Sequence, residues 1–261
     1  SLDWRCLDYE NNYSTTLKLN NLINFKSFSI LSRLKYLIKH EASISIILAF
    51  LKFQLTKPFF NTFRSKDKKL NKEIIKDKLV TDDFFSINVF DWKKNLNQYK
   101  KKNDVSYLEI GSFEGISAYF IHKFFNSKII HCVDTWLGSD EHGDDTNFKN
   151  VESNFDKNTK KIKNLNKYKT TSDNFFDNNQ SYFDIIYIDG LHKYYQVKKD
   201  LNNALKFIKK DGTIICDDYF WNINGDKLDK PINAINEIIK GNNLKIVAVT
   251  VNQIFIKKNW S

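Results

Sequence analysis

The sequence of 261 residues contains no methionine, only two prolines and only three cysteines. The absence of methionine, including at position 1, predicts a processed chain or a fragment of a longer protein. The odd number of cysteines argues against a disulfide framework or a zinc site, and Cys132 and Cys216 stand in apolar segments. We interpret all three, Cys6 included, as small buried side chains in a reducing, cytoplasmic compartment.

Long apolar runs and arginine are also scarce. No segment approaches the roughly 18 apolar residues that a transmembrane helix needs, so we expect no membrane span. Arginine occurs only at positions 5, 33 and 64. Nucleic-acid readers depend on arginine for bidentate contacts, and no recognisable binding module is present. We therefore predict no nucleic-acid partner.

Positive charge is concentrated in the first 80 residues. They contain 15 Lys and Arg against 7 Asp and Glu, a net charge of +8 out of +10 for the whole chain. The remaining 181 residues are almost neutral, at +2. The basic character is thus a property of the N-terminal region, and we place a domain boundary near residue 80, between a basic helical extension (1–80) and a second domain (81–261).

Apolar spacing in this extension predicts two helices, at 27–40 and 42–55. Lys57 and Pro58 are predicted to end the second helix, and residues 65–79 to form a charged, solvated connector.

Two roles remain open for these helices. Five apolar residues share one face of the second helix: Ile44, Ile47, Leu48, Leu51 and Leu55. Packing of this face onto the second domain, or onto a second subunit in a homo-oligomer, is the favoured interpretation. The alternative is a peripheral contact of residues 20–60 with an anionic membrane surface, since a basic amphipathic segment suits such a surface.

The most informative motif is a glycine loop. Residues 105–110 are predicted to form a buried strand and residues 116–125 a helix, with Gly111 and Gly115 between them. The loop has neither the Gly-x-Gly-x-x-Gly of dinucleotide sites nor the lysine of a P-loop. Acidic residues at 109 and 114 would repel a pyrophosphate but suit the ammonium group of S-adenosylmethionine. A purely structural glycine turn is the alternative.

A second apolar strand, 128–134, ends in Asp134 about 20 residues after the loop. An acidic residue at this place accepts hydrogen bonds from the two ribose hydroxyls in doubly wound folds, so Asp134 is predicted to bind the ribose.

Strands and helices continue to alternate along the chain. The predicted helices are 148–163, 195–209 and 231–240, and the predicted strands are 168–170, 181–190, 212–218, 245–251 and 253–257. The tight connection at residues 252–253 predicts that the last two strands form an antiparallel hairpin. The fold class is therefore α/β: a doubly wound, mostly parallel seven-stranded sheet with a C-terminal hairpin and an N-terminal helical extension.

Four motifs now support a resemblance: Glu109 to Gly115, Val133 to Trp136, Ile188 to His192, and Cys216 to Asp218. In their order and spacing, residues 104–258 resemble class I S-adenosylmethionine-dependent methyltransferases, and in detail the bacterial macrocin-type and catechol-type O-methyltransferases. The first 80 residues lie outside the resemblance.

The resemblance implies a cofactor site and a metal site at the carboxyl ends of the strands. The cofactor residues are predicted to be Glu109, Gly111, Ser112, Gly115, Asp134, Thr135, Trp136, Ser172 and Asp173. Asp189, Asp217 and Asp218 are predicted to hold Mg²⁺, which prefers oxygen ligands. An alternative for Asp217 and Asp218 is to cap the loop after their strand.

His192 is predicted to act with Asp189 as the catalytic pair, removing the proton of the acceptor hydroxyl. His122 and His131 are interpreted as structural, and His142 lies in an acidic loop, 138–145, that is either a lid or a solvated segment.

The predicted function is O-methylation of a sugar, glycan or related small molecule, with natural-product phenols as second choice. One competing hypothesis is a cofactor-binding accessory protein, docked to a membrane or partner and without methyl transfer. A nicotinamide-dependent oxidoreductase is the other, and the missing dinucleotide motif argues against it.

Overall fold

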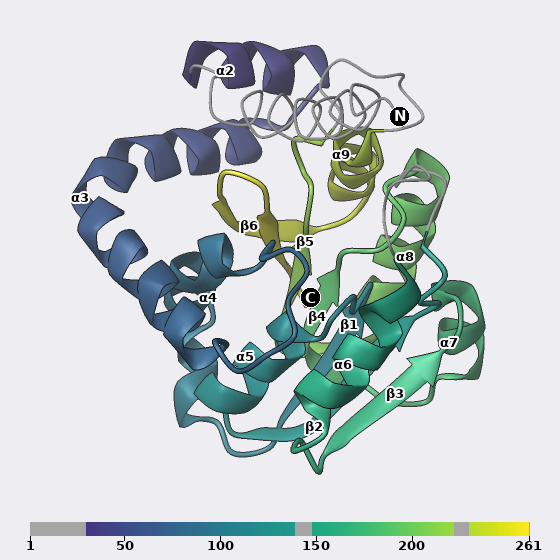
Figure 1. The fold of residues 1–261 in the computed structure, drawn as a ribbon. Helices are drawn as coiled ribbons and strands as arrows, with labels where there is room; N and C mark the ends of the chain where they lie inside the picture. Colours follow the sequence, from purple (N-terminus) through teal and green to yellow (C-terminus); the bar gives the residue numbers. More distant parts are fainter. Residues whose placement is uncertain (1–29, 139–147, 222–229, 261) are drawn as a thin grey trace, which may run out of the picture.

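The computed structural model describes residues 30–138, 148–221 and 230–260 (Figure 1). Cys6, residues 20–29 of the predicted membrane-facing segment, and His142 with most of its loop lie outside the described residues.

One sheet of seven strands forms the centre of the molecule. Its strands are β1 (Val105–Ile110), β2 (Ser127–Asp134), β3 (Leu165–Lys169), β4 (Phe183–Ile188), β5 (Ile208–Cys216), β6 (Leu244–Val249) and β7 (Ile254–Lys258). They lie in the order β3-β2-β1-β4-β5-β7-β6. The first five are parallel, and β7 is antiparallel to both β5 and β6. The predicted fold class, including the terminal hairpin, is confirmed.

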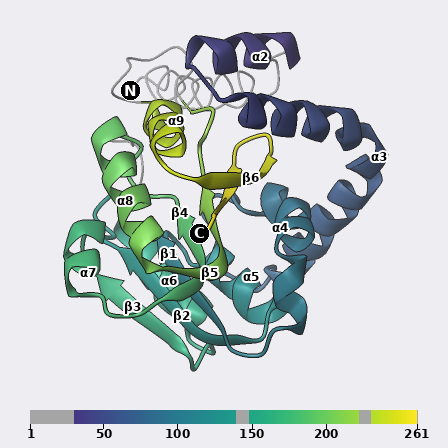
Figure 2. The ribbon, with the colours of Figure 1, turned by 180° about the vertical axis from the view of Figure 1, so that it is seen from behind.

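Helices cover both faces of the sheet (Figures 1 and 2). They include α4 (Val89–Asn95), α5 (Ile116–Phe124), α6 (Val151–Thr159), α7 (Ser172–Asn178), α8 (Tyr194–Phe207) and α9 (Pro231–Gly241). Every residue of β1 and β4 is buried, as expected for central strands packed on two sides. Side chains alternate between two cores, so that Tyr107 packs with α4 and α5, whereas Leu108 packs with α8 and α9.

The N-terminal region contains α2 (Ile30–Lys39) and α3 (Ile44–Ile74). The prediction that Lys57 and Pro58 end a helix is wrong, because α3 continues through Pro58 for 31 residues in all. It also includes most of the predicted solvated connector. α3 packs against β6, α4 and the short 3-10 helix η1 (Ser86–Asn88), and both views show it running along the β6 side of the sheet.

These two helices share a core with the sheet. Tyr36, Leu37, Ile46 and Phe50 are buried in the same cluster as residues of β4, β5, α8 and α9. Helix α3 does pack onto the rest of the chain, but the predicted face is wrong: Ile44, Leu48 and Leu55 are 58 to 73% exposed, and the face that carries Ile46, Phe50 and Phe53 is buried instead. None of the helices in the described ranges combines the length and apolar content needed to cross a bilayer.

Candidate functional site

The loop after β1 is fixed against the end of β4. Gly111 has a φ of +86°, and a Cβ there would lie 1.9 Å from the carbonyl oxygen of Asp189. The same two segments are joined by a hydrogen bond of 2.8 Å from the backbone N–H of Asp189 to the carbonyl of Ile110. Only glycine can occupy position 111, because any other side chain would collide with the loop that carries Asp189.

Glu109 lies beneath this loop and is fully buried. Its carboxylate accepts hydrogen bonds from the hydroxyls of Tyr107 (3.0 Å) and Ser117 (2.5 Å). Burial raises the pKa of Glu109 to about 8. The uncharged acid is therefore the stable form at neutral pH in the chain without a cofactor.

Glu114 has a structural role. It is 1% exposed and accepts hydrogen bonds from the N–H and hydroxyl of Thr81 and from the side-chain amide of Asn154. We correct the interpretation that Glu114 selects a cationic cofactor, because its carboxylate instead joins the segment before β1 to α6.

Gly115 is required for packing. It begins α5 with a φ of +76°, and a Cβ would lie 2.8 Å from the methyl carbon of Thr159 and 2.9 Å from the ring of Phe155. Its contact with the cofactor stays a prediction, as does that of the buried Ser112.

Asp134 stands at the end of β2 with both carboxylate oxygens oriented by backbone N–H groups, those of Phe113 (2.9 Å) and Trp136 (2.8 Å). Its place at the carboxyl edge of the sheet suits the predicted ribose contact. The buried Trp136 indole donates to the carbonyl of Phe113 (2.8 Å), so Trp136 supports the loop from the core side. Neighbouring Thr135 accepts from the N–H of Leu137.

Ser172 and Asp173, predicted to border the adenine, lie at the start of α7 and are tied to α8. The Gln196 amide donates to both side chains, at 3.0 and 3.2 Å, and Lys199 forms an ion pair with Asp173. Their place after β3 agrees with the prediction, which stays untested.

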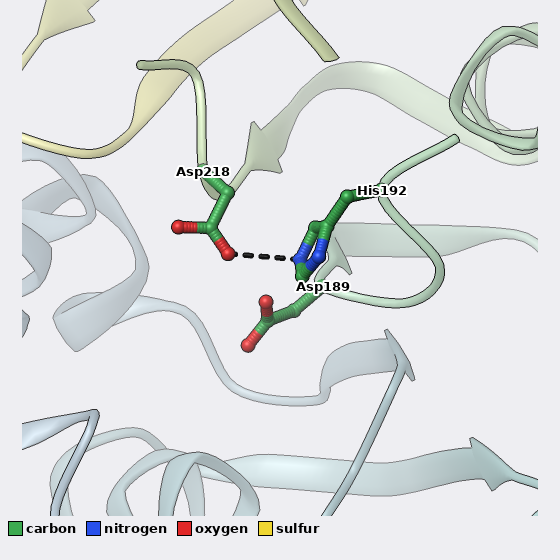
Figure 3. A group of neighbouring side chains, drawn as sticks. All are labelled: Asp189, His192 and Asp218. Atoms are coloured by element: carbon green, nitrogen blue, oxygen red, sulfur yellow. Dashed lines mark ion pairs between the residues drawn. The ribbon is translucent and has the colours of Figure 1, made fainter. Parts of the chain in front are cut away.

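The predicted catalytic pair and two of the three predicted metal ligands converge, since Asp189 was predicted in both roles. Asp189 follows β4, His192 lies in the loop before α8, and Asp218 follows β5 (Figure 3). One potential ligand atom from each lies within 4.8 Å of the others, and His192 Nε2 is 2.8 Å from Asp218 Oδ2. The ring of Trp221 packs on the imidazole at a centroid distance of 5.1 Å.

Asp217 is not part of this cluster in the structure, which corrects the predicted metal set. One carboxylate oxygen accepts hydrogen bonds from the hydroxyl of Tyr187 and the amide of Gln253 (2.8 Å), and the other accepts from the backbone N–H of Asp218 (2.8 Å). Burial and the neighbouring Asp218 raise the pKa of Asp217 to about 6. Its side chain is turned toward the protein interior.

Tyr187 and Gln253 were not among the predicted site residues. The Tyr187 hydroxyl lies within hydrogen-bonding distance of both Asp189 (2.8 Å) and Asp217, so its one proton can be donated to either, and Tyr187 stands two residues before Asp189, with the same side-chain direction. That spacing was a usable signal. Gln253 gave none, because only the pairing of β7 with β5 brings it to Asp217, where Trp92 also holds it through a 2.9 Å hydrogen bond.

The donor set of the cluster fits a divalent cation. Burial, followed by the charges of Asp217 and Asp218, raises the pKa of Asp189 well above its ordinary value. A cation among these carboxylates would remove that repulsion. Two carboxylates and one imidazole are ordinary ligands for divalent metals, with the carboxylates preferred by Mg²⁺.

Comparison with known proteins agrees with the fold. Residues 108–219 match the family model of a methyltransferase domain. A mycinamycin-pathway methyltransferase, solved with Mg, S-adenosylhomocysteine and mycinamycin VI, superposes with a TM-score of 0.53 at 15% identity, covering 74% of this chain and 53% of that one. A caffeoyl-CoA O-methyltransferase-like structure from Staphylococcus aureus also gives 0.53, at 15% identity, covering 78% of this chain and all of that one.

The O-methyltransferase TomG of Streptomyces achromogenes, solved with S-adenosylmethionine, gives a TM-score of 0.51 at 11% identity, with coverage of 76% of this chain and 89% of that one. Among curated proteins, an uncharacterized protein of Acanthamoeba polyphaga mimivirus is 31% identical over 131 residues, which cover 48% of this chain and 57% of the relative. The chain thus spans little more than half of this relative. Residues 108–219 thus match a methyltransferase domain, and the sheet with its strand order has the fold of the solved methyltransferases named above.

Proposed function

We propose that the protein transfers a methyl group from S-adenosylmethionine to a hydroxyl oxygen, with a divalent cation beside the acceptor. The observation that carries this proposal is the convergence of Asp189, His192 and Asp218 at the ends of β4 and β5, next to the glycine loop of β1. The cofactor and acceptor groups thereby share one edge of the sheet, where open α/β sheets bind ligands.

In this proposal each half of the site has its own task. The loop of Gly111 and the carboxylate of Asp134 hold the cofactor, whose sulfonium carries the reactivity, so the protein contributes mainly alignment. Asp189 and Asp218 hold the cation, Mg²⁺ by preference for oxygen ligands, and it would lower the pKa of a bound hydroxyl. His192 accepts the hydroxyl proton as the methyl group is transferred, and Asp218 orients its imidazole through the 2.8 Å contact.

The acceptor class that we propose is a hydroxyl of a sugar or glycan. The support is a similarity of fold to the mycinamycin-pathway methyltransferase, whose structure contains Mg, S-adenosylhomocysteine and mycinamycin VI. A phenol is the second candidate, because the caffeoyl-CoA-type structure shares the fold to the same degree.

The test is calorimetric titration with S-adenosylhomocysteine, with and without Mg²⁺, followed by methyl-transfer assays on sugar and phenol acceptors. Asp218→Asn should lower turnover by about 100-fold or more while S-adenosylhomocysteine affinity stays within a few fold. Asp177→Asn, an exposed change on α7, is the matched control and should leave both unchanged. Equal loss of turnover and cofactor affinity in Asp218→Asn would contradict the metal assignment.

His192→Gln separates the two roles open to the imidazole. As the proton acceptor, His192 is needed for turnover but not for Mg²⁺ binding, so the variant should lose turnover and keep its Mg²⁺ affinity. A matching loss of Mg²⁺ affinity would instead make His192 a ligand. Intact cofactor binding with no transfer to any acceptor tested would favour the competing hypothesis of an accessory protein.

A further inference from the structure

Helix α3 has a second apolar face, opposite the one that packs on the sheet. Six large apolar side chains on it are 44 to 79% exposed, and we call them the outer stripe: Ile44, Leu48, Leu55, Phe59, Phe63 and Leu70. At about 100° per residue they fall within an arc of about 100°, and they extend over about 39 Å of helix. The face that carries Ile46, Phe50 and Phe53 lies on the other side and is buried.

Exposed apolar surface is concentrated here. Of the sixteen large hydrophobic residues that are exposed in the described part of the chain, nine lie in α2 or α3. Besides the outer stripe they include Ile30, Leu31 and Ile38 of α2, which are 51 to 60% exposed. Single exposed apolar residues need no explanation, but a continuous row of this length marks an interaction surface.

The surroundings of the outer stripe are basic. Residues 30–74 contain ten Lys and Arg against three Asp and Glu, a net charge of +7 out of +10 for the chain. Lys52 and Lys66 are exposed and lie within the arc itself. Two of the three acids are engaged: Asp67 pairs with Lys93 at 2.6 Å and Glu41 with Lys240 at 2.6 Å.

We propose that the outer stripe docks the protein on an anionic lipid bilayer, with α3 lying in the plane of the interface. Apolar side chains would enter the boundary between headgroups and acyl chains, while Lys52 and Lys66 extend their ammonium groups to the headgroups. Each lysine near such a surface contributes favourably. A second copy of the chain fits less well, because joining two outer stripes would bring the lysines of both copies together.

The docking surface is attached to the candidate site through α2. The Arg33 guanidinium donates to the carbonyl of Val251 (2.9 Å) and lies 5.2 Å from the ring centroid of Phe220, two residues after Asp218. Tyr36 also packs near Phe220, at a centroid distance of 6.3 Å. A membrane bound at α3 would therefore hold the carboxyl edge of β5 in a fixed orientation.

Vesicle flotation of the full chain tests the proposal. Vesicles of phosphatidylcholine mixed with phosphatidylglycerol should bind the protein, and vesicles of phosphatidylcholine alone should bind it weakly. Replacing Leu55 and Phe59 together by Ser should lower binding by about tenfold or more. Replacing Lys52 and Lys66 together by Glu should also lower binding by about tenfold. Added salt should weaken the binding of the wild type, because it screens the attraction between lysine and the anionic headgroups. Tyr182→Ser, an exposed aromatic outside α2 and α3, is the matched control and should bind like the wild type.

Circular dichroism and S-adenosylhomocysteine titration of each variant show whether the fold is kept, and neither depends on methyl transfer. Absence of binding to the mixed vesicles, or undiminished binding of the Leu55 and Phe59 double variant, would overturn the proposal. A dimer seen by light scattering that the same double variant converts to a monomer, without vesicle binding, would assign the outer stripe to a second copy instead.

Discussion

Acidic side chains that are buried or half-buried are the main feature of this site at the scale of single residues. Glu109, Asp189 and Asp217 all have a raised pKa, in each case chiefly because burial disfavours the charged form. Asp189 belongs to the cluster around His192 and Asp217 is next to Asp218 in sequence, whereas Glu109 has no contact with these residues among its hydrogen bonds in the described part of the chain. Its titration can therefore be studied without interference from a bound cation.

Glu109→Gln should change how stability depends on pH. The pKa of Glu109 is about 8 in the folded chain against an ordinary value of 4.5, so the acid stabilises the fold fully below pH 4.5. That contribution is lost as pH rises through 8. In the absence of cofactor, the free energy of unfolding of the wild type should fall by about 3 to 5 kcal/mol relative to that of the glutamine variant as pH rises from 4.5 to 8. Urea unfolding at several pH values measures the difference, and parallel profiles for the two proteins would contradict it.

The sequence predicted which acidic residues lie at the strand ends, but not how their side chains are oriented. Asp134, Asp189 and Asp218 follow strand ends, and a parallel sheet brings such residues to one edge. Asp217 follows the same strand as Asp218, yet its side chain is held inward by Tyr187 and Gln253. That orientation depends on a pairing between β5 and β7 that no local pattern specifies.

At the scale of elements, α3 departs most from the predicted structure. Pro58 and the lysine-rich segment after it are local signals for the end of a helix, but the helix persists to Ile74. Packing compensates, because the side chains of α3 beyond Pro58 contact α4. Arg64 forms a bidentate ion pair with Asp91 of α4, at 2.5 and 2.6 Å, and Lys93 pairs with Asp67.

Pro58→Ala should therefore stabilise the protein, by about 1 to 3 kcal/mol. Proline within a helix removes a hydrogen bond and crowds the preceding turn, and this cost exceeds the entropy that proline saves in the unfolded chain. Chemical denaturation is the measurement. The other proline offers a control: Pro231 lies in the first turn of α9, where proline is favoured, so Pro231→Ala should give no gain. Loss of stability in Pro58→Ala would show that the helix needs a bend at this point.

The remaining elements were largely predictable. Strands β1, β2 and β4 appear within two residues of their predicted ends, because continuous apolar runs bounded by glycine or acidic residues are typical of central parallel strands. The segment that forms η1 and α4 was not predicted. Its helices are very short, and Trp92 and Tyr99 near them are buried by contacts distant in sequence.

On the scale of the whole molecule, the N-terminal helices and the sheet share one buried core, and we expect them to unfold together. Phe50 of α3 has no exposed surface and packs 5.8 Å from Phe220, measured between ring centroids. The boundary near residue 80 stays a prediction, because it rests on a change in charge, and charge does not show which apolar faces meet in the core.

Phe50→Ala tests this cooperativity, and it should destabilise the entire chain by about 3 to 5 kcal/mol. Tryptophan fluorescence, to which the buried Trp92 of the second core cluster contributes, and far-ultraviolet circular dichroism should report the same shifted transition. Phe59→Ala on the same helix is the matched control: its side chain is 79% exposed, so stability should change by less than about 0.5 kcal/mol. Loss of helical signal in Phe50→Ala before any change in fluorescence would show that α2 and α3 unfold on their own.

The close contact between Gly111 and the carbonyl of Asp189 has a thermodynamic consequence for the two halves of the site. A cofactor that shifts the loop after β1 must also shift the backbone that presents Asp189 to a cation. Binding at the two halves is then linked, and linkage is reciprocal: cofactor changes cation affinity by the same factor by which cation changes cofactor affinity. Through Gly111, the cofactor and the cation would thus each act as an effector of the other, although they bind at the ends of two neighbouring strands, β1 and β4.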